Sequence, residues 1–217
     1  MTSVNEEQRA PAAPLAEQAY VALRDLVVTL QLPPGTPLNE DGLTARLGVG
    51  RTPLREAIKR LEAENLIVIY PRRGTFVAEI DITDHGLICD VRRQLEGLAA
   101  YRAAQRATEA DKRRLAELAA TLRRHPGGRR AGMQLDTLVH REVYKCCHNR
   151  YLQADLEHYY DLSLRIWYLF LDRLPEVDHR TEHLPMLEAI QNGDADGART
   201  AAAAHVTTFE RAVRSVI

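Results

Sequence analysis

The stretch from Leu43 to Val77, LTARLGVGRTPLREAIKRLEAENLIVIYPRRGTFV, constrains the fold of this chain most. Gly48 divides it into two segments with helical spacing, as a glycine that ends a helix would. The second segment has one apolar face, formed by Leu54, Ala57, Ile58 and Leu61. Next come a β-branched run, LIVIY, the turn PRRG and a return strand, TFVAEI. This order of helix, turn, helix and hairpin predicts a winged helix-turn-helix.

Positive charge is concentrated in this stretch, although the net charge of the chain is −1. Between Arg51 and Arg73, six Lys or Arg residues stand against three acids. The start of the second helix is the part that enters a major groove, where arginine can pair with guanine. These charges could instead be an ordinary solvated face, but the Arg-Arg-Gly hairpin tip argues against that. We therefore predict DNA contacts from Arg51, Thr52, Arg55, Lys59, Arg72, Arg73 and Gly74.

The flanking sequence completes a small N-terminal domain. Apolar residues at helical spacing predict a helix from Leu15 to Leu30. Asn39 is suited to cap a second helix that runs to about Leu47. Thr52 followed by Pro53 suggests that the third helix is capped by the Thr52 hydroxyl.

The rest of the chain has only helical patterns, so the fold class is mainly α. We predict a disordered tail over residues 1–14, a winged helix-turn-helix domain over 15–78 and a linker over 79–83. An all-helical domain of about six helices then covers residues 84–217. Its first helix runs from Asp84 to Arg106 with Val91, Leu95 and Leu98 facing inward. Thr108 is expected to cap the second helix, because Asp111 three residues later completes a pattern like a capping box. The third helix is expected to begin at Met133.

Composition narrows the class of protein. The three cysteines are Cys89, Cys146 and Cys147, and the chain has no CxxC motif. A disulfide framework or a thiolate zinc site is therefore not expected, and a reducing cytoplasm fits. No apolar run is long enough to cross a membrane, and the N-terminus does not resemble a secretory signal. We expect a cytoplasmic protein.

Four polar residues interrupt apolar patterns in the helical domain and suggest a metal site. Asp136 and His140 are four residues apart and share a helix face, and His183 and His205 lie in two later helices. Such groups are costly to bury unless they bind something, and a divalent metal suits an N₃O set. Spacing alone leaves alternatives open. The Asp136 and His140 pair could be a surface ion pair, and His179 also stands four residues from His183.

The segment RLGVGRTPLREAIKRLEAENLIVIYPRRGTFV resembles the winged helix of the GntR family of bacterial transcription regulators. The family pattern LGVSR-TPVREAL-RL matches almost position by position. The resemblance implies DNA contacts at Arg51, Thr52, Arg55 and the wing around Arg73 and Gly74. Gly50 departs from the pattern, because the family usually has serine there, and the missing hydroxyl removes a phosphate contact or a helix cap.

The helical domain is similar to the FCD effector domain of the FadR subfamily of GntR regulators. Its matching segments are DVRRQLEGLAA, DTLVHREVYKCCHNRYL and EHLPMLEAIQNGDADGARTAAAAH. Metal-binding members have Asp-x₃-His and two later histidines, which Asp136, His140, His183 and His205 match. The resemblance implies a divalent transition metal, with zinc expected first and nickel, manganese or iron as alternatives.

The same resemblance implies a small effector, often a carboxylate, at or beside the metal. Arg92 is the first candidate for its counter-charge, although an i,i+4 salt bridge with Glu96 explains Arg92 equally well. Tyr144 and Asn149 are weaker candidates for the effector pocket. The aromatic residues of the following helix are expected to serve core and dimer packing: Tyr159, Tyr160, Trp167, Tyr168 and Phe170.

These features predict a ligand-responsive transcription regulator rather than an enzyme. It would bind a palindromic operator as a homodimer, because two recognition helices must meet two half-sites. Repression relieved by an effector is the common outcome in the family. A metal-sensing regulator is the first alternative. A metal-dependent enzyme with a DNA-binding appendage is the second, but the sequence has no nucleophile elbow, phosphate loop or general base placed by a motif.

Overall fold

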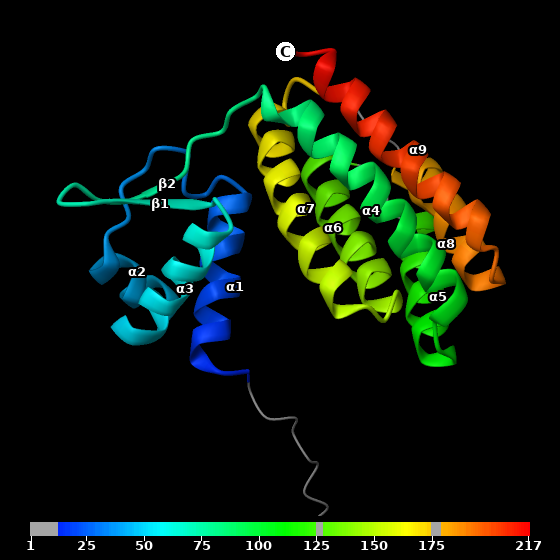
Figure 1. The fold of residues 1–217 in the computed structure, drawn as a ribbon, viewed down its shortest axis with the longest axis horizontal. Helices are drawn as coiled ribbons and strands as arrows, with labels where there is room; N and C mark the ends of the chain where they lie inside the picture. The colour runs from blue at the N-terminus through cyan, green and yellow to red at the C-terminus, as the bar shows by residue number, and fades with distance from the viewer. Residues whose placement is uncertain (1–12, 125–127, 175–178) are drawn as a thin grey trace, which may run out of the picture. The chain divides into compact units, whose positions relative to one another are not determined.

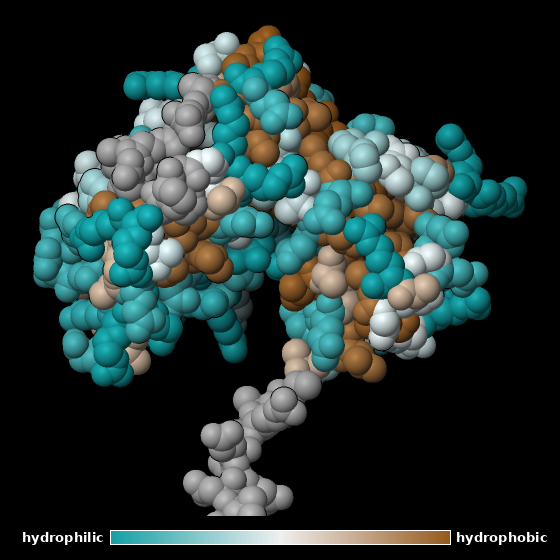
Figure 2. Space-filling model, turned by 180° about the vertical axis from the view of Figure 1, so that it is seen from behind, coloured by the Kyte–Doolittle hydropathy of each residue, from teal (hydrophilic) through white to brown (hydrophobic). Residues whose placement is uncertain are grey.

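The computed structural model describes residues 13–124, 128–174 and 179–217, so most of the predicted tail lies outside the described residues. The chain divides into two compact units, Met1–Glu79 and Ile80–Ile217. Each is described by itself (Figure 1). Hydrophilic residues cover much of the face drawn in Figure 2, with hydrophobic residues gathered in patches between them. In the described part of the chain, every helix is too short or too polar to span a bilayer.

The N-terminal unit has the predicted winged helix-turn-helix fold. It consists of α1 (Leu15–Val28), α2 (Glu40–Leu47), α3 (Arg51–Ala63), β1 (Ile67–Tyr70) and β2 (Gly74–Val77). The two strands pair antiparallel, with Ile67 opposite Val77 and Tyr70 opposite Gly74. Leu23 of α1 and Leu54 and Leu61 of α3 are fully buried. The apolar face expected on the second helix of the motif therefore packs into the core of this unit.

The two ends of α2 confirm two predictions, and the start of α3 corrects a third. The Asn39 side chain accepts hydrogen bonds from the backbone N–H groups of Asp41 and Gly42, and Gly48 ends α2 in the left-handed conformation, with φ of 65°. However, α3 begins at Arg51 and its N-cap is Gly50, not Thr52. The Gly50 carbonyl already accepts a hydrogen bond from Leu54 N–H, so Thr52 lies inside the first turn.

The C-terminal unit is an all-helical bundle, as predicted. Its described helices are α4 (Asp84–Arg106), α5 (Glu109–Arg124), α6 (Arg129–Cys146), α7 (Arg150–Phe170), α8 (His179–Asn192) and α9 (Ala195–Arg214). In Figure 1, α4 crosses the middle of this unit, with α9 on one side and α6 and α7 on the other. Helix α6 begins four residues earlier than the predicted start at Met133. Its first residue, Arg129, donates to the Leu171 and Leu174 carbonyls after α7, which ties this end to the bundle.

The predicted orientation of α4 was wrong. Val91 and Leu98 are exposed, each with 37% of its surface accessible, and Leu95 is only half-buried. The inward face carries Cys89, Arg92, Glu96 and a run of alanines, Ala99, Ala100 and Ala103. Small residues let α9 approach closely, and the charged pair has partners inside the bundle. Helix phase was therefore set by close packing and by polar partners rather than by the largest apolar residues.

Helix α5 begins with the predicted capping box. Thr108 N–H and its hydroxyl both donate to Asp111 Oδ2, and Asp111 N–H donates to Thr108 Oγ1 at 3.2 Å. Asp111 also contacts His148 Nε2 at 2.8 Å and forms an ion pair with Arg114. This buried carboxylate therefore links the start of α5 to the end of α6.

Candidate functional site

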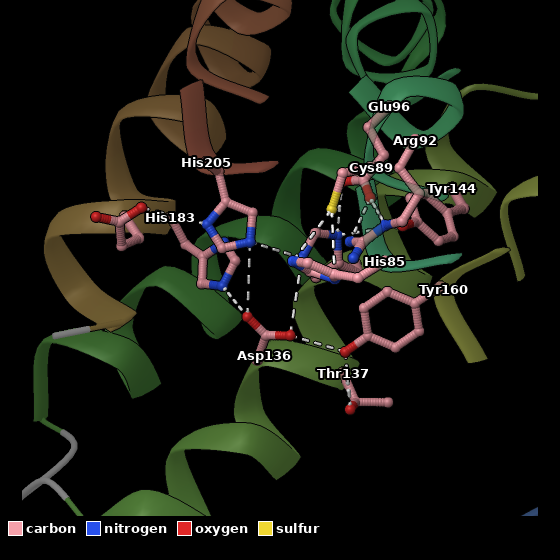
Figure 3. Close-up of polar contacts among 12 residues, drawn as sticks. His85, Cys89, Arg92, Glu96, Asp136, Thr137, Tyr144, Tyr160, His183 and His205 are labelled. Atoms are coloured by element: carbon pink, nitrogen blue, oxygen red, sulfur yellow. Dashed lines mark hydrogen bonds and ion pairs between the residues drawn. The ribbon is translucent and has the colours of Figure 1, made fainter. Parts of the chain in front are cut away.

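Asp136, His140, His183 and His205 meet at one point inside the helical unit, from helices α6, α8 and α9 (Figure 3). Each offers a ligand atom, and the four atoms lie within 4.8 Å of one another. His140 Nε2 lies 3.1 Å from His205 Nε2. Asp136 Oδ1 lies 2.8 Å from His183 Nε2 and 3.8 Å from His205 Nε2. Helical folding places the first two on one face of α6, and packing of α8 and α9 brings the others to them.

The donor set fits a divalent transition metal. Donor atoms about 2.0–2.2 Å from one ion lie roughly 3 Å from each other, close to the spacing of His140 and His205. All four residues are buried, with His183 fully so. A carboxylate and three imidazoles in such a place suit zinc, nickel, manganese or iron. The alternative pair of His183 with His179 is not tested, because the side chain of His179 lies outside the described residues.

Other polar groups contact three of these residues, Asp136, His140 and His205. Tyr160 OH donates to Asp136 Oδ2 at 2.7 Å. Glu96 Oε2 lies 3.0 Å from His140 Nδ1, and Tyr144 OH lies 3.2 Å from the same nitrogen. Glu182 Oε2 lies 3.4 Å from His205 Nδ1. In both His140 and His205, the Nδ1 atom, which faces away from the point where the four residues meet, therefore has a carboxylate partner.

Burial and local charge set the protonation of these groups. Burial, helped by His205, lowers the pKa of His183 to about 4, so its ring is neutral at pH 7 and can bind a metal. Burial opposes the charged form of His140, but Glu96 and Asp136 outweigh it and raise its pKa. Burial and the Asp136 charge hold the pKa of Tyr160 well above its usual value, so the phenol stays a hydrogen-bond donor.

A cavity of about 20 Å³, enough for roughly one water molecule, is lined by two of the four residues, Asp136 and His205. Arg92 lines it, but both Arg92 Nε and one terminal nitrogen donate to Glu96 Oε1, at 2.8 and 2.5 Å. The salt bridge considered as the alternative for Arg92 is thus present. Among the described residues, the lining consists of Arg92, Met133, Asp136, Tyr160, Leu164, Trp167, Glu182, His205, Thr208 and Phe209.

Two predicted effector residues do not line this cavity. Asn149 is the N-cap of α7, where its side chain accepts hydrogen bonds from Tyr151 and Leu152 N–H, and this capping role explains its residue type. Tyr144 is buried behind His140 rather than facing the cavity. Glu96 and Tyr160 contact His140 and Asp136, but the sequence did not predict either contact. The i,i+4 spacing from Arg92 pointed to Glu96 only as a salt-bridge partner, and Tyr160 was assigned to packing.

In the N-terminal unit, the predicted DNA contacts lie on α3 and at the hairpin tip. Arg51, Thr52, Arg55 and Lys59 are all exposed. Arg51 pairs with Asp41 at 2.9 Å, and Arg55 pairs with Glu40 at 2.8 Å, so acids of α2 contact both arginines. Such exposed pairs contribute only about 0–1 kcal/mol, so these side chains can exchange their partners for phosphates or bases.

The hairpin tip has the backbone of a tight turn. Arg72 and Gly74 have positive φ angles, 62° and 111°, which glycine tolerates and arginine does not favour. The Arg73 guanidinium lies 5.4 Å from the centre of the Tyr70 ring, and Tyr70 packs edge-on against Phe76. The strands thus present the two arginines and the glycine together at one end of the hairpin.

Each of the two units matches a known protein family model. Residues 15–77 match the model of the bacterial regulatory proteins of the gntR family, and residues 87–208 match the FCD domain. The chain belongs to the GntR family and carries an FCD domain. It is therefore a transcription regulator that binds DNA, not an enzyme, and FCD domains typically bind small-molecule effectors.

Individual relatives support this assignment. The HTH-type transcriptional repressor RspR of Escherichia coli is 28% identical over 215 residues, which cover 97% of this chain and 94% of that protein. A regulator described as "in unstable DNA locus" of Streptomyces ambofaciens is 45% identical over 62 residues, 29% of this chain and 26% of that protein. The structure of E. coli McbR/YncC has a TM-score of 0.78 at 21% identity over 94% of this chain and 99% of that one, which shows a shared fold.

Proposed function

We propose that this regulator is a homodimeric repressor whose FCD domain binds a divalent metal and, beside it, a small carboxylate effector. The observation that carries the proposal is the buried set of three histidines and one aspartate next to a cavity. The relative RspR is named a transcriptional repressor, which supports repression as the outcome. Effector binding would change DNA affinity by favouring one arrangement of the protein over another.

The charges around the cavity support a role for the metal in binding the effector. Arg92 is already shared with Glu96, so its positive charge is largely balanced. Asp136 and Glu182 add negative charge to the lining. A carboxylate would be repelled by these groups unless a divalent cation were present. We therefore expect effector binding to require the metal, with Arg92 giving secondary support.

An exposed apolar stripe on α4 supports the homodimer. Leu87, Val91 and Leu98 recur at helical spacing and have 67%, 37% and 37% of their surface exposed. A second copy of the same stripe, related by a two-fold axis, would cover these residues. Two winged helices could then bind the two halves of a palindromic operator.

The test of DNA binding is a mobility-shift assay on the promoter beside the gene, with the Arg51→Ala and Arg55→Ala variants. Each substitution should weaken the specific complex by roughly tenfold or more, because one bidentate contact contributes about 1–3 kcal/mol. Glu62→Gln, a charge change near the end of α3, is the control and should bind like the wild type. Binding that is unchanged in both arginine variants would contradict the proposed surface.

The second candidate is a metal sensor, in which the metal itself is the signal. The small volume of the cavity favours it, because about 20 Å³ leaves little room for an effector in this conformation. Metal analysis of protein purified without added metal distinguishes the two: tight stoichiometric metal supports effector binding, and weakly held metal supports sensing. In either case His183→Ala with His205→Ala should abolish the bound metal, and retention of the metal would refute the ligand assignment.

A further inference from the structure

We propose that Glu96 is a positioning residue of the metal centre, which fixes the ring of His140, and that Arg92 serves chiefly to hold Glu96. This inference rests on the proposed metal site. It assigns a role to a residue that does not contact the metal ligand atoms directly. The contacts run from Arg92 to Glu96 and from Glu96 to His140; Arg92 and Glu96 are labelled in Figure 3.

The geometry of the Glu96 carboxylate carries the argument. Oε1 accepts two hydrogen bonds from Arg92, at 2.8 and 2.5 Å, and Oε2 lies 3.0 Å from His140 Nδ1. Each oxygen therefore has its own partner. A carboxylate oxygen only accepts hydrogen bonds, so His140 must carry its proton on Nδ1 to satisfy this contact. Nε2 then has a lone pair for a metal, on the side of the ring that faces Asp136 and His205.

Arg92, Glu96 and His140 are all buried, so the contacts between them form without competition from solvent. Glu96, Arg92 and His140 expose 2%, 3% and 1% of their surfaces. A buried carboxylate is costly unless it is paired and fully hydrogen-bonded. The Arg92 guanidinium also lies close to two rings, 5.2 Å from the centre of Tyr160 and 5.3 Å from that of Phe209. The two hydrogen bonds from Arg92 restrict the rotation of the Glu96 carboxylate, and the carboxylate in turn restricts the His140 ring.

Carboxylate partners of this kind orient metal-binding histidines and raise their basicity, and their loss commonly weakens metal binding about 10–100-fold. Glu96 also belongs to α4, whereas all four ligands belong to α6, α8 and α9. Through His140 the metal site thus extends to the first helix of the domain. A ligand-induced shift of the His140 ring would change the contact with α4 directly.

The experiment is a double-mutant cycle on metal affinity, measured by competition with a chromophoric chelator for Zn²⁺. The variants are Glu96→Gln, His140→Ala and the double substitution. Glu96→Gln should weaken Zn²⁺ binding at least tenfold in the wild type and much less in His140→Ala, where the ring it orients is missing. The uncompensated charge of Arg92 weakens binding equally in both backgrounds and cancels from the comparison.

Asp161→Asn is the matched control, because Asp161 is a buried carboxylate paired with an arginine, Arg141, at 3.2 Å. It should leave Zn²⁺ affinity unchanged. An equal cost of Glu96→Gln in both backgrounds, or no cost in either, would overturn the role of Glu96. If the wild type itself binds no Zn²⁺, the proposed metal site fails instead. Trp167 fluorescence checks folding, and Glu96→Asp replaces Glu96→Gln in the cycle if the latter does not fold.

Discussion

At the scale of single residues, substitution of Tyr160 tests how much the groups around the proposed metal centre contribute to metal binding. Its hydroxyl donates to Asp136 Oδ2 at 2.7 Å inside the bundle. Tyr160→Phe removes this donor, and a hydrogen bond to a charged group contributes about 1.5–3 kcal/mol. We expect roughly tenfold weaker Zn²⁺ binding in a chelator competition assay. Tyr159→Phe, at the next and only half-buried position, should have no effect, and equal losses in both variants would contradict the role of Tyr160.

The sequence identified the four residues that converge inside the bundle as candidate metal ligands, but not the residues that contact them. Asp136, His140, His183 and His205 were identified because polar groups in apolar patterns are conspicuous and because a family pattern matched them. Glu96 and Tyr160 were not, because each has an ordinary local explanation, a salt bridge or an aromatic core. Their role depends on which helices pack together, and the spacing of residues along one helix does not contain that information.

At the scale of elements, the start of α5 depends on Asp111. Asp111→Asn should lower the free energy of unfolding by about 1–2 kcal/mol at pH 7, because it weakens the capping box and removes the ion pair with Arg114. Urea unfolding followed by Trp167 fluorescence measures this, since the chain has a single tryptophan. Glu109→Gln, an exposed change in the same turn, should cost little, and a similar loss there would point to a general charge effect.

The contribution of the Asp111 carboxylate to the free energy of unfolding depends on pH. Burial disfavours its charge, but hydrogen bonds from Thr108 and the contact with His148 outweigh this and hold the pKa of Asp111 well below its usual range. A group with a lowered pKa stabilises the fold above its unfolded pKa, about 3.9 for aspartate, and this stabilisation is lost as pH falls below it. The difference between wild type and Asp111→Asn should therefore shrink between pH 5 and pH 3.

The pairing of α2 with α3 gives a prediction about DNA. Asp41 contacts Arg51, and both side chains are exposed. Asp41→Asn frees the arginine and removes a negative charge near the phosphates, so non-specific DNA affinity should rise several-fold. The salt dependence of binding, measured by fluorescence anisotropy, should steepen by up to about one unit in slope. Asp25→Asn makes the same charge change on α1, and an equal rise there would show that net charge alone is responsible.

Element boundaries were predicted better than the orientation of the elements. The α4 range from Asp84 to Arg106 and the capping box of α5 follow from local signals, and both match the structure. The orientation of α4 differs from the prediction. Alanines and the buried ion pair face the core, and Leu98 is exposed. Packing distance between helices decided that orientation, and a single sequence gives no measure of this distance.

At the scale of the whole molecule, the stripe on α4 predicts the oligomeric state. Leu87→Glu with Leu98→Glu places charge at two positions that the proposed dimer would bury, so the protein should become a monomer in analytical ultracentrifugation. Its affinity for a palindromic operator should fall more than its affinity for a single half-site. Leu138→Glu, on the exposed surface of α6, should leave the dimer intact, and a dimer that persists in the double variant would exclude this face.

Helix α4 presents these two features on opposite sides: Leu87, Val91 and Leu98 outward, and Arg92 and Glu96 inward. A rigid helix cannot move on one side without moving on the other. If both surfaces function as proposed, metal binding and subunit association are linked reactions, and linkage between two binding equilibria is reciprocal. The apparent affinity for Zn²⁺ should then change with protein concentration across the range in which the dimer dissociates, so that protein abundance would itself tune metal occupancy.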